Sequence, residues 1–396
     1  MASTLLLYGA TGYSGRLIAA ELKHRQAVQP GAFSIVLAGR NAQPLIELAN
    51  ALGTAYCVLD LEDGQAQVRR VIGEHEATVI INAAGPFART ADRLAKAAIA
   101  LGCHYVDING EADVYRKVDD NGTEASAANV ALVCGAGFWA AASNLLLDAA
   151  LQALALPENT ELGAIRIAMS RIKTFSRGSA ETVWESLRQQ VLVVRKGRNE
   201  RDAVDRLVLR HEPVGKLERR FNFGDTRPTK VDDWRIASAA NLVDTLAAQR
   251  TVEHRRRMVR TIESYVEAGR LARAAYQLGG WLAPLVANRT VRTLAQQPIE
   301  LLAAGPTKKE REAEPHLIVL EIEDCLHNTL IDWRWKTPNV YQFTAQLAVG
   351  VAVRLGTGAR LKGFLTPAQV LAATEVMQYP GAGTLRNCLL ERRRGT

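Results

Sequence analysis

The first third of the chain alternates short apolar runs with longer segments whose apolar residues recur at helical spacing. This alternation is typical of a parallel sheet covered by helices, because such strands are buried on both sides. Six strands are predicted in this region, at Leu5–Tyr8, Ile35–Ala38, Tyr56–Leu59, Val79–Asn82, Tyr105–Ile108 and Val130–Cys134. Helices are predicted between them at Gly12–Lys23, Gln43–Leu52 and Ala91–Leu101. The pattern therefore indicates an α/β fold with a doubly wound parallel sheet.

The pattern changes at Leu156–Thr160, where proline and small polar residues predict a linker. Beyond it the sequence predicts an α+β region, with strands at 164–172, 206–210 and 217–223 and a helix at Ser179–Val194. Later segments read as mainly helical over 241–305, as two strands at 316–323 and 328–335 with a turn at Asp324–His327, and as helices at 340–354 and 367–377. We expect a dinucleotide-binding domain over 1–156, an α+β substrate or dimerisation domain over 161–340, and C-terminal helices over 341–396 that pack back on the core.

Residues 130–156 are apolar almost throughout and long enough to span a bilayer. Glycine and polar residues divide them into a β-branched run and a helical run, which favours a buried strand and a buried helix over a membrane span. No basic region precedes the apolar run at the N-terminus, so no signal peptide is expected. The five cysteines are dispersed without C-x-x-C spacing, which favours the cytoplasm and argues against disulfides or a metal site.

The chain carries a formal net charge of +8, with basic residues gathered at Arg250–Arg273 and Arg392–Arg394. This excess suits anionic partners such as nucleotide phosphates or an acyl-carrier domain, but no nucleic-acid motif accompanies it, so nucleic acid is not expected as a partner. Residues 265–302 set Leu, Tyr and Trp among arginines, as in a basic amphipathic helix that contacts a carrier protein or a membrane surface. Core helices with solvated arginine edges look similar.

The clearest chemical signal is the G-x-x-G-x-x-G turn at Gly9–Gly15, between the first predicted strand and helix. In such a turn the first glycine permits the bend, the second lets the backbone approach a pyrophosphate, and the third lets helix and strand pack closely. The helix N-terminus then offers backbone N–H groups to the phosphates. The expected cofactor-binding residues are Gly9, Thr11, Gly12, Tyr13, Ser14 and Gly15. A glycine-rich turn without a ligand is the alternative.

The end of the second predicted strand indicates which nucleotide binds. Enzymes that use NAD place Asp or Glu there for the ribose hydroxyls, whereas this chain has Ala38-Gly39-Arg40. A guanidinium can clamp a 2′-phosphate, so Arg40 is predicted to select NADP(H), with Asn41 assisting and Asp60 on the adenine side. An exposed surface arginine at a helix start is the alternative interpretation of Arg40.

Two further loops follow strands at the sheet edge where such folds bind ligands. Ala83, Ala84, Gly85, Pro86 and Phe87 are predicted to border the cofactor, and Gly137 and Phe138 to line the nicotinamide pocket. Either loop can also be an ordinary tight turn.

Asp107 and Glu111 place two carboxylates near this edge, where they can hold a substrate amine or carry a proton. A strand end and a helix cap explain them equally well. Ser176, Ser179 and Thr182 open a predicted helix and offer donors to a substrate carbonyl, with a helix N-cap as the alternative.

Taken together, several motifs resemble the saccharopine dehydrogenase-like NADP-binding family, and within it the trans-acting enoyl reductases that serve polyketide synthases. They are G-A-T-G-Y-S-G, L-A-G-R, N-A-A-G-P-F, the stretch from Gly102 to Glu111, G-A-G-F, Ser176–Thr182, Phe223-Gly224-Asp225, Gly305-Pro306 and Thr366-Pro367. The resemblance implies a Rossmann domain, an α+β second domain and NADP(H) as hydride carrier. It does not imply lysine metabolism, because no arginine cluster for a dicarboxylic amino acid is evident. Trp139–Ser143 replaces the more usual family sequence after G-x-G-F, which predicts an altered pocket.

We therefore expect an NADPH-dependent oxidoreductase, cytoplasmic or peripheral to a membrane, that reduces a C=C or C=O bond of an acyl or lipophilic small molecule. An NADP(H)-binding sensor or scaffold without turnover is the main alternative, because no clear proton donor is visible. A third interpretation is an NADP-dependent amino-acid dehydrogenase in which Asp107 or Glu111 binds the substrate amine. A homodimer is compatible with all three.

Overall fold

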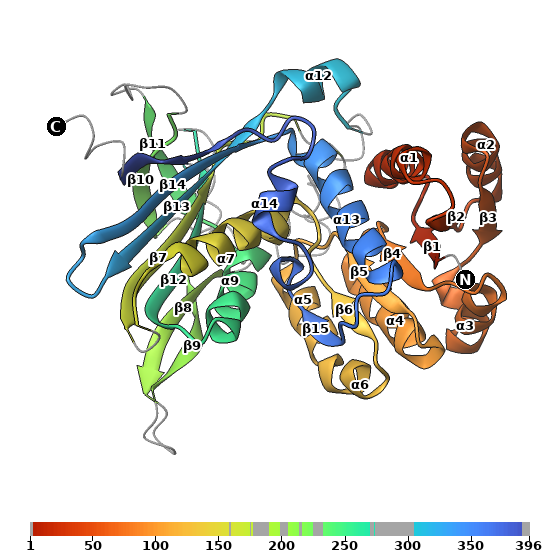
Figure 1. Cartoon of the computed structure of the whole chain (residues 1–396), viewed down its shortest axis with the longest axis horizontal. Helices are drawn as coiled ribbons and strands as arrows, with labels where there is room; N and C mark the ends of the chain where they lie inside the picture. Colours follow the sequence, from red (N-terminus) through yellow and green to blue (C-terminus); the bar gives the residue numbers. More distant parts are fainter. Residues whose placement is uncertain are drawn as a thin grey trace, which may run out of the picture. The chain divides into compact units, whose positions relative to one another are not determined.

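The chain is described by a computed structural model that covers residues 3–157, 160–174, 176, 190–198, 205–213, 216–224, 233–269, 273 and 305–389. Contacts between residues divide the chain into two compact units (Figure 1). The first unit comprises Met1–Ala142 and Tyr341–Ala372, and the second comprises Ser143–Val340 and Ala373–Thr396. Each unit is built on its own sheet.

The sheet of the first unit has seven parallel strands in the order β15-β6-β5-β4-β1-β2-β3. Their bounds are Ser3–Tyr8 (β1), Phe33–Gly39 (β2), Ala55–Val58 (β3), Val79–Asn82 (β4), His104–Asp107 (β5), Ala131–Val133 (β6) and Gly363–Leu365 (β15). The six strands predicted here are present, which confirms the parallel α/β fold. Strand order reverses between β1 and β4, so the loops after these two strands flank the point where dinucleotide folds bind their ligand.

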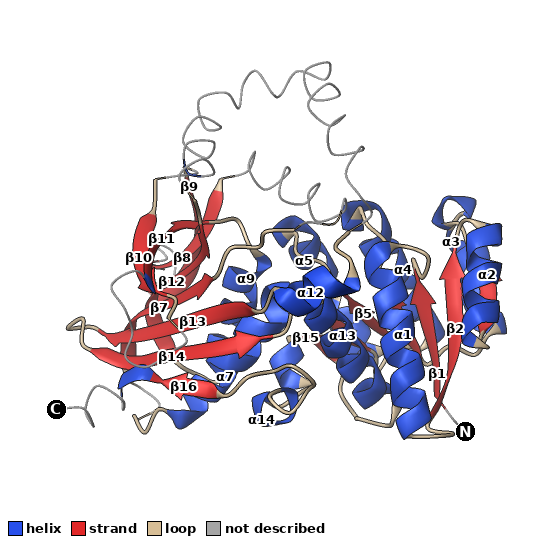
Figure 2. Ribbon diagram, turned by 90° about the horizontal axis from the view of Figure 1, so that it is seen from above, coloured by secondary structure: helices blue, strands red, loops and turns tan. Residues whose placement is uncertain are grey.

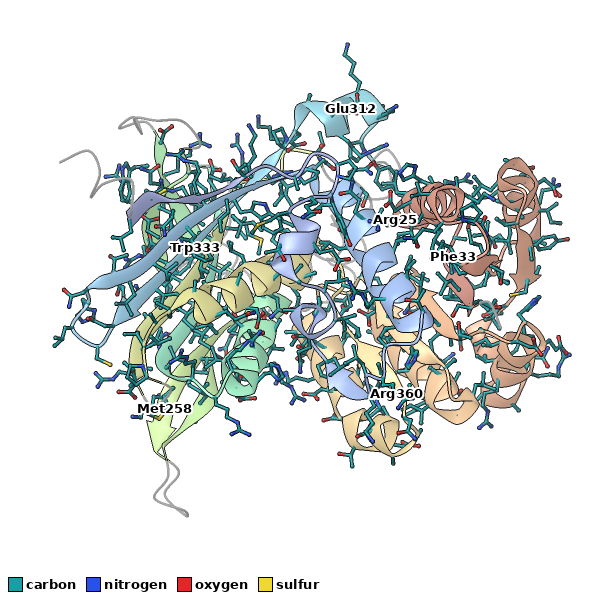
Figure 3. All side chains as sticks on the ribbon, viewed as in Figure 1. Arg25, Phe33, Met258, Glu312, Trp333 and Arg360 are labelled. Atoms are coloured by element: carbon teal, nitrogen blue, oxygen red, sulfur yellow. The ribbon has the colours of Figure 1, made fainter. Side chains whose placement is uncertain are left out.

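The centre of this sheet is fully apolar, because parallel strands face helices on both sides. Leu5, Leu6 and Leu7 of β1 and Ile80 and Ile81 of β4 are completely buried. Phe33, labelled in Figure 3, begins β2 and is also buried. Strands buried in this way appear in the sequence as continuous apolar runs, so their positions could be predicted well.

Helices cover both faces of this sheet, with α1 and α13 on one side and α4 and α5 on the other (Figure 1). Their bounds are Tyr13–Val28 (α1), Ala42–Leu52 (α2), Gln65–Glu74 (α3), Phe87–Leu101 (α4), Ala112–Asp119 (α5), Gly122–Ala127 (α6) and Val340–Gly356 (α13), with short turns at Leu61–Asp63 (η1), Phe138–Ala142 (η2) and Pro367–Gln369 (η4). Helices α1 and α13 meet at Tyr13 and Tyr341, whose ring centroids lie 5.0 Å apart in an edge-to-face arrangement. The C-terminal segment thus contributes a helix and the strand β15 to the first unit.

The sheet of the second unit runs in the order β10-β11-β12-β7-β13-β14-β16, and β8 pairs with β12 and β9 (Figure 2). The bounds are Glu161–Met169 (β7), Val191–Arg198 (β8), Asp205–Glu212 (β9), Glu218–Asn222 (β10), Trp234–Ala239 (β11), Met258–Glu267 (β12), His316–Asp324 (β13), Thr329–Thr337 (β14) and Leu385–Asn387 (β16). Strands β12 and β7 are parallel, and the other described pairs are antiparallel. This mixed sheet confirms an α+β second region.

The helices of the second unit are Ser143–Ala153 (α7), Val243–His254 (α9), Lys308–Ala313 (α12) and Ala373–Val376 (α14). Helices α7 and α9 pack against each other and against β12, β13 and β8 on one face of the sheet (Figure 1). Arg255, which follows α9, donates from Nε and Nη2 to the two carboxylate oxygens of Asp148 on α7, at 2.6 and 2.7 Å. This bidentate pair fixes the register of the two helices.

Several predictions beyond residue 160 are corrected by the structure. The helix predicted at Ser179–Val194 is wrong at its C-terminal end, because residues 191–194 belong to β8 and pair with β9; residues 179–189 lie outside the described residues. The mainly helical prediction for 241–305 is right for α9 but wrong for β12, and residues 274–304 are not described. The helix predicted at 367–377 is two short pieces, η4 and α14.

The apolar segment 130–156 divides as predicted into a buried strand, β6, and a buried helix, α7, with η2 between them. Among the helices described here, none combines the length and the apolar composition needed to cross a membrane.

Candidate functional site

The glycine turn after β1 is the first element of the site. Gly9 has a φ of 81°, a backbone conformation that favours glycine. A Cβ at this position would also lie 2.8 Å from both the backbone nitrogen and the Cβ of Ala84, in the loop after β4. A Cβ at Gly15 would lie 2.1 Å from the Gly9 carbonyl oxygen. The two glycines therefore allow strand, helix and neighbouring loop to approach as closely as a dinucleotide-binding turn requires.

Gly12 differs from these two, because it is exposed and is the N-cap of α1. A Cβ there would have one close protein atom, the Gly9 carbonyl oxygen at 3.3 Å. No side chain of the described residues caps this helix, and its first turn holds no acidic residue. The first turn, which supplies the N–H groups of Tyr13, Ser14 and Gly15, thus carries no acidic side chain of its own that would compete with a phosphate. This is a cradle that fits a pyrophosphate.

Arg40 directly follows β2, the neighbour of β1 in the sheet, and is exposed. Within the described ranges, no ion pair or hydrogen bond engages its guanidinium. Tyr8, at the end of β1, lies within reach of this charge. Burial raises the pKa of Tyr8 to about 12, and the positive charge of Arg40 opposes that rise. Asn41 is the exposed N-cap of α2, without a side-chain cap bond.

Asp60 lies on the same side of the site, because its charge also acts on Tyr8. Its carboxylate accepts a hydrogen bond from the Glu62 N–H at 3.0 Å and so caps the turn η1. The neighbouring Glu62 forms an ion pair with Arg93 at 3.0 Å. Asp60 thus caps η1, and the Glu62 carboxylate pairs with an arginine of α4; in the described part of the chain neither carboxylate pairs with Arg40.

The loop after β4 holds Ala83, Ala84, Gly85 and Pro86 at the edge predicted for them, and Phe87 begins α4. Asn82, completely buried, shapes it: its Oδ1 accepts from the Ala84 N–H at 3.0 Å, and its Nδ2 donates to Thr90 Oγ1 and to the Tyr105 hydroxyl, each at 3.1 Å. Thr90 in turn donates to the Ala84 carbonyl at 2.8 Å. The loop is therefore preformed beside the glycine turn.

Asp107 ends β5 and is completely buried. Its Oδ2 accepts from the Tyr105 hydroxyl at 2.9 Å, and its Oδ1 accepts from the N–H groups of Asn109 at 3.0 Å and Gly135 at 2.8 Å. Burial raises the pKa of Asp107, and the backbone donors oppose that rise. All these partners are protein groups, so the carboxylate ties together the loops after β5 and β6.

Glu111 is half-buried and is the N-cap residue of α5. Its N–H donates to Asn109 Oδ1 at 2.8 Å, and Asn109 Nδ2 donates to the Glu111 carbonyl at 3.0 Å. Of the two predicted acidic residues, Glu111 is the one that is partly exposed.

The loop after β6 contains Gly137 and Phe138, both buried. The Phe138 N–H donates to Thr344 Oγ1 on α13 at 2.9 Å, and a Cβ at Gly137 would lie 3.3 Å from Thr344 Cγ2. The helix α13 thus packs against this loop and holds it by a hydrogen bond. Sequence reasoning missed this contact, because 206 residues separate the partners.

The predicted substrate-side residues belong to the second unit. Ser176 is described and buried, at 4% exposure. Ser179 and Thr182 lie outside the described residues, as does nearly all of the basic segment 265–302 beyond Gly269. Where the chain is described, no group of three His, Cys, Asp or Glu side chains could hold a metal ion.

Sequence reasoning also missed the residues that organise the site from within, namely Tyr8, Asn82, Thr90, Tyr105 and Asn109. Only Asn82 and Asn109 carried a signal, as polar residues in or beside predicted strands. Their roles follow from strand register, in which Tyr8 pairs with Asn82 and Asn82 pairs with Asp107.

Comparison with known families gives a match over the region that holds this glycine turn. Residues 5–133 match the family model described as the saccharopine dehydrogenase NADP binding domain. Over these residues the first unit is similar to the NADP-binding domain of saccharopine dehydrogenases. The match covers β1 to β6 and includes the glycine turn, Arg40 and the Asp107 network.

Curated relatives match about a third of the chain. A trans-acting enoyl reductase of Mycobacterium tuberculosis is 32% identical over 141 residues, which is 33% of this chain and 32% of the relative. The corresponding protein of Mycobacterium leprae is 28% identical over 145 residues, 36% of this chain and 34% of the relative. The matched region thus spans about a third of the length of these relatives.

One solved structure aligns with nearly the whole chain. The apo saccharopine dehydrogenase (L-Glu forming) of Saccharomyces cerevisiae has a TM-score of 0.59 at 12% identity, covering 97% of this chain and 99% of that one. This likeness shows the fold: a parallel Rossmann sheet followed by a mixed-sheet region.

Proposed function

We propose that this protein is an NADPH-dependent oxidoreductase that reduces a C=C or C=O bond of an acyl or other lipophilic small molecule. The observation that carries the proposal is the glycine turn at the start of α1, which has no side-chain cap among the described residues, together with the Arg40 guanidinium after β2, which no described residue engages. The 32% identity to a trans-acting enoyl reductase supports an enoyl group as the acceptor.

In this proposal, different residues of the chain bind different parts of NADPH. Backbone N–H groups at Tyr13, Ser14 and Gly15 would hold the pyrophosphate, since the exposed Gly12 leaves room for close approach. Arg40 would clamp the 2′-phosphate, with Asn41 beside it. The loops at 83–87 and 137–138 would border the ribose and nicotinamide.

Bound NADPH would supply a hydride to the β-carbon of the acceptor, and a proton would add to the α-carbon to complete the saturated product. In this proposal Glu111 exchanges that proton with solvent, because it is half-buried, and Asp107 positions the surrounding loops. Ser176, Ser179 and Thr182 are proposed as donors to the substrate carbonyl, whose oxygen gains charge during the transfer.

All five cysteines lie in described residues and none forms a disulfide. We therefore place the protein in a reducing compartment, the cytoplasm, as part of the proposal. A carrier-bound acyl substrate and a homodimer remain part of the same proposal.

The test is a titration of NADPH and NADH by fluorescence with wild type and Arg40→Asp. The variant should lose affinity for NADPH by on the order of 10- to 100-fold, because charge-assisted phosphate contacts are removed, and should gain affinity for NADH. Arg360→Asp is the matched control, since Arg360 is exposed on the same unit and makes the same charge change (Figure 3). Equal NADPH affinity in the Arg40 and Arg360 variants would refute the assignment.

A turnover panel of enoyl thioesters, enals, ketones and imines then separates the remaining functions. Oxidation of NADPH by enoyl thioesters is the expected result. Tight NADPH binding without oxidation by any acceptor would favour a cofactor sensor. Glutamate-dependent reduction of NADP⁺ would instead indicate an amino-acid dehydrogenase.

A further inference from the structure

Trp139 is the one residue between Val130 and Asp148 that is not buried. Its neighbours Phe138 and Ala140 are at most 1% exposed, and so are Ala141 and Ala142. The loop after β6 thus reaches the surface at a single, large aromatic side chain. Apolar surface placed so selectively within a buried segment calls for a physical explanation.

The backbone around Trp139 supplies one. Ala140 has φ 78° and ψ −57°, a rare turn conformation that favours glycine. Such a conformation costs roughly 1–3 kcal/mol and persists when the surrounding structure enforces it, most often at functional sites. Here the turn leaves Trp139 partly exposed while Ala140 itself stays buried.

Contacts on both sides of the turn enforce this conformation. Before it, the Gly135 N–H donates to Asp107 Oδ1 at 2.8 Å, and the Ala136 N–H donates to the Asp107 carbonyl at 2.7 Å. Within it, the Phe138 N–H donates to Thr344 Oγ1 at 2.9 Å, and the Ala141 N–H donates to the Gly137 carbonyl at 3.1 Å. The loop is therefore held by β5 and α13, and the position of Trp139 is fixed before any ligand arrives.

The indole lies over the loop that follows β5. A Cβ at Gly110 would lie 3.7 Å from Trp139 Cδ1, so the ring covers this glycine. The ring also meets that of Phe138 in an edge-to-face arrangement, with centroids 5.6 Å apart and an interplanar angle of 79°. Both loops lie at the carboxyl edge of β5 and β6, on the half of the sheet beyond the point where strand order reverses. That half receives the second mononucleotide of a dinucleotide.

We propose that Trp139 is a specificity-determining residue that packs its indole face against the hydride acceptor beside the nicotinamide, and selects flat, conjugated acyl groups. This inference rests on the proposed function. An extended indole face gives a planar enoyl group more contact than a tetrahedral or branched one, because both surfaces are flat. The contacts with Gly110 and Phe138 hold the ring in place.

The experiment compares Trp139→Phe and Trp139→Ala with the matched variants Trp234→Phe and Trp234→Ala, because Trp234 is 42% exposed on β11 of the second unit. The first readout is energy transfer from tryptophan to bound NADPH, excited at the indole and measured at saturating nucleotide. Trp139→Phe should lose a larger share of the transferred signal than Trp234→Phe. Thermal melting verifies that each variant folds.

The second readout is steady-state kinetics with a planar enoyl thioester and with a saturated ketone of equal chain length. Trp139→Ala should raise KM for the enoyl substrate by roughly tenfold or more, while Trp139→Phe restores most of the affinity and NADPH affinity changes little. Trp234→Ala should match wild type in both readouts.

The outcomes separate the two proposals. If wild type binds neither nicotinamide nucleotide, the proposed function fails and the role of Trp139 falls with it. If wild type binds NADPH and turns over the enoyl substrate, but the folded Trp139 variants show wild-type energy transfer and wild-type KM, the inference alone is overturned.

Discussion

The glycine turn offers a sharp prediction, because Gly12 and Gly15 are two positions of one motif with opposite structural demands. A Cβ at Gly15 would lie 2.1 Å from the Gly9 carbonyl oxygen and 2.9 Å from the Ala10 carbonyl carbon. Backbone must move to admit it, so Gly15→Ala should destabilise the first unit by about 1–3 kcal/mol or more. A Cβ at Gly12 meets that carbonyl oxygen at 3.3 Å, and its φ of −69° suits alanine.

Gly12→Ala should therefore fold and yet fail to bind. Alanine is a poorer N-cap than glycine, which costs roughly 0.5 kcal/mol of stability. The new methyl group fills the space above the first turn of α1 and disrupts at least one charge-assisted hydrogen bond to phosphate, worth about 1.5–3 kcal/mol. NADPH affinity should fall by roughly 10- to 150-fold.

The assay is a urea denaturation curve and an NADPH titration for each variant. Gly73→Ala is the matched control, because Gly73 lies within α3 and a Cβ there meets Leu101 Cδ2 at an ordinary 3.6 Å. It should gain about 0.5–1 kcal/mol of stability and keep its NADPH affinity. If Gly12→Ala binds NADPH as tightly as Gly73→Ala does, the cradle at the start of α1 is not the phosphate site.

Three further predictions concern buried groups. Asp107→Asn replaces the oxygen that accepts from the Tyr105 hydroxyl. It should lower the free energy of unfolding, measured with urea, by about 1–3 kcal/mol and should weaken NADPH binding. A variant as stable as wild type would show that Asp107 does not tie the two loops together. Ala140→Gly relieves the turn at φ 78° and should raise the free energy of unfolding by about 0.5–1 kcal/mol, whereas a loss would show that the turn is unstrained. Burial lowers the pKa of His316 to about 4. As the pH falls, the imidazole of the unfolded chain is protonated below about pH 6.5, whereas that of the folded chain is protonated only near pH 4. Stability should therefore fall by about 3 kcal/mol between those pH values, His316→Gln should lose most of that dependence, and the exposed control His327→Gln should keep it.

The sequence predicted the first sheet well because its strands are apolar on both faces. Strand β4 occurs at the predicted Val79–Asn82, and β1 and β5 differ from the prediction by one or two residues at their ends. The strand β15 escaped notice, because three residues give no periodic signal.

The second unit was harder to predict. The Val191–Val194 end of β8 is a short continuous apolar run, which periodicity alone cannot assign to a helix or a strand. Met258–Glu267 lies in an arginine-rich region whose charges resembled a helix face, yet it pairs with β7 and β11 as a central strand.

The candidate site was predicted where it depends on motif spacing and missed where it depends on tertiary contact. Arg40 and the three glycines follow from the order of strand, turn and helix. The buried chain from Thr90 through Asn82 and Tyr105 to Asp107 follows from strand register, which one sequence does not display. The unusual turn at Ala140 was invisible, because nothing in an alanine run marks a positive φ.

Isothermal titration calorimetry of the purified wild-type protein with NADPH and with NADH tests the central claim most directly. The account predicts one NADPH bound per chain, at least tenfold tighter than NADH, because only the 2′-phosphate engages the Arg40 guanidinium. The absence of binding heat with both nucleotides, at protein and ligand concentrations that would reveal a micromolar dissociation constant, would contradict it.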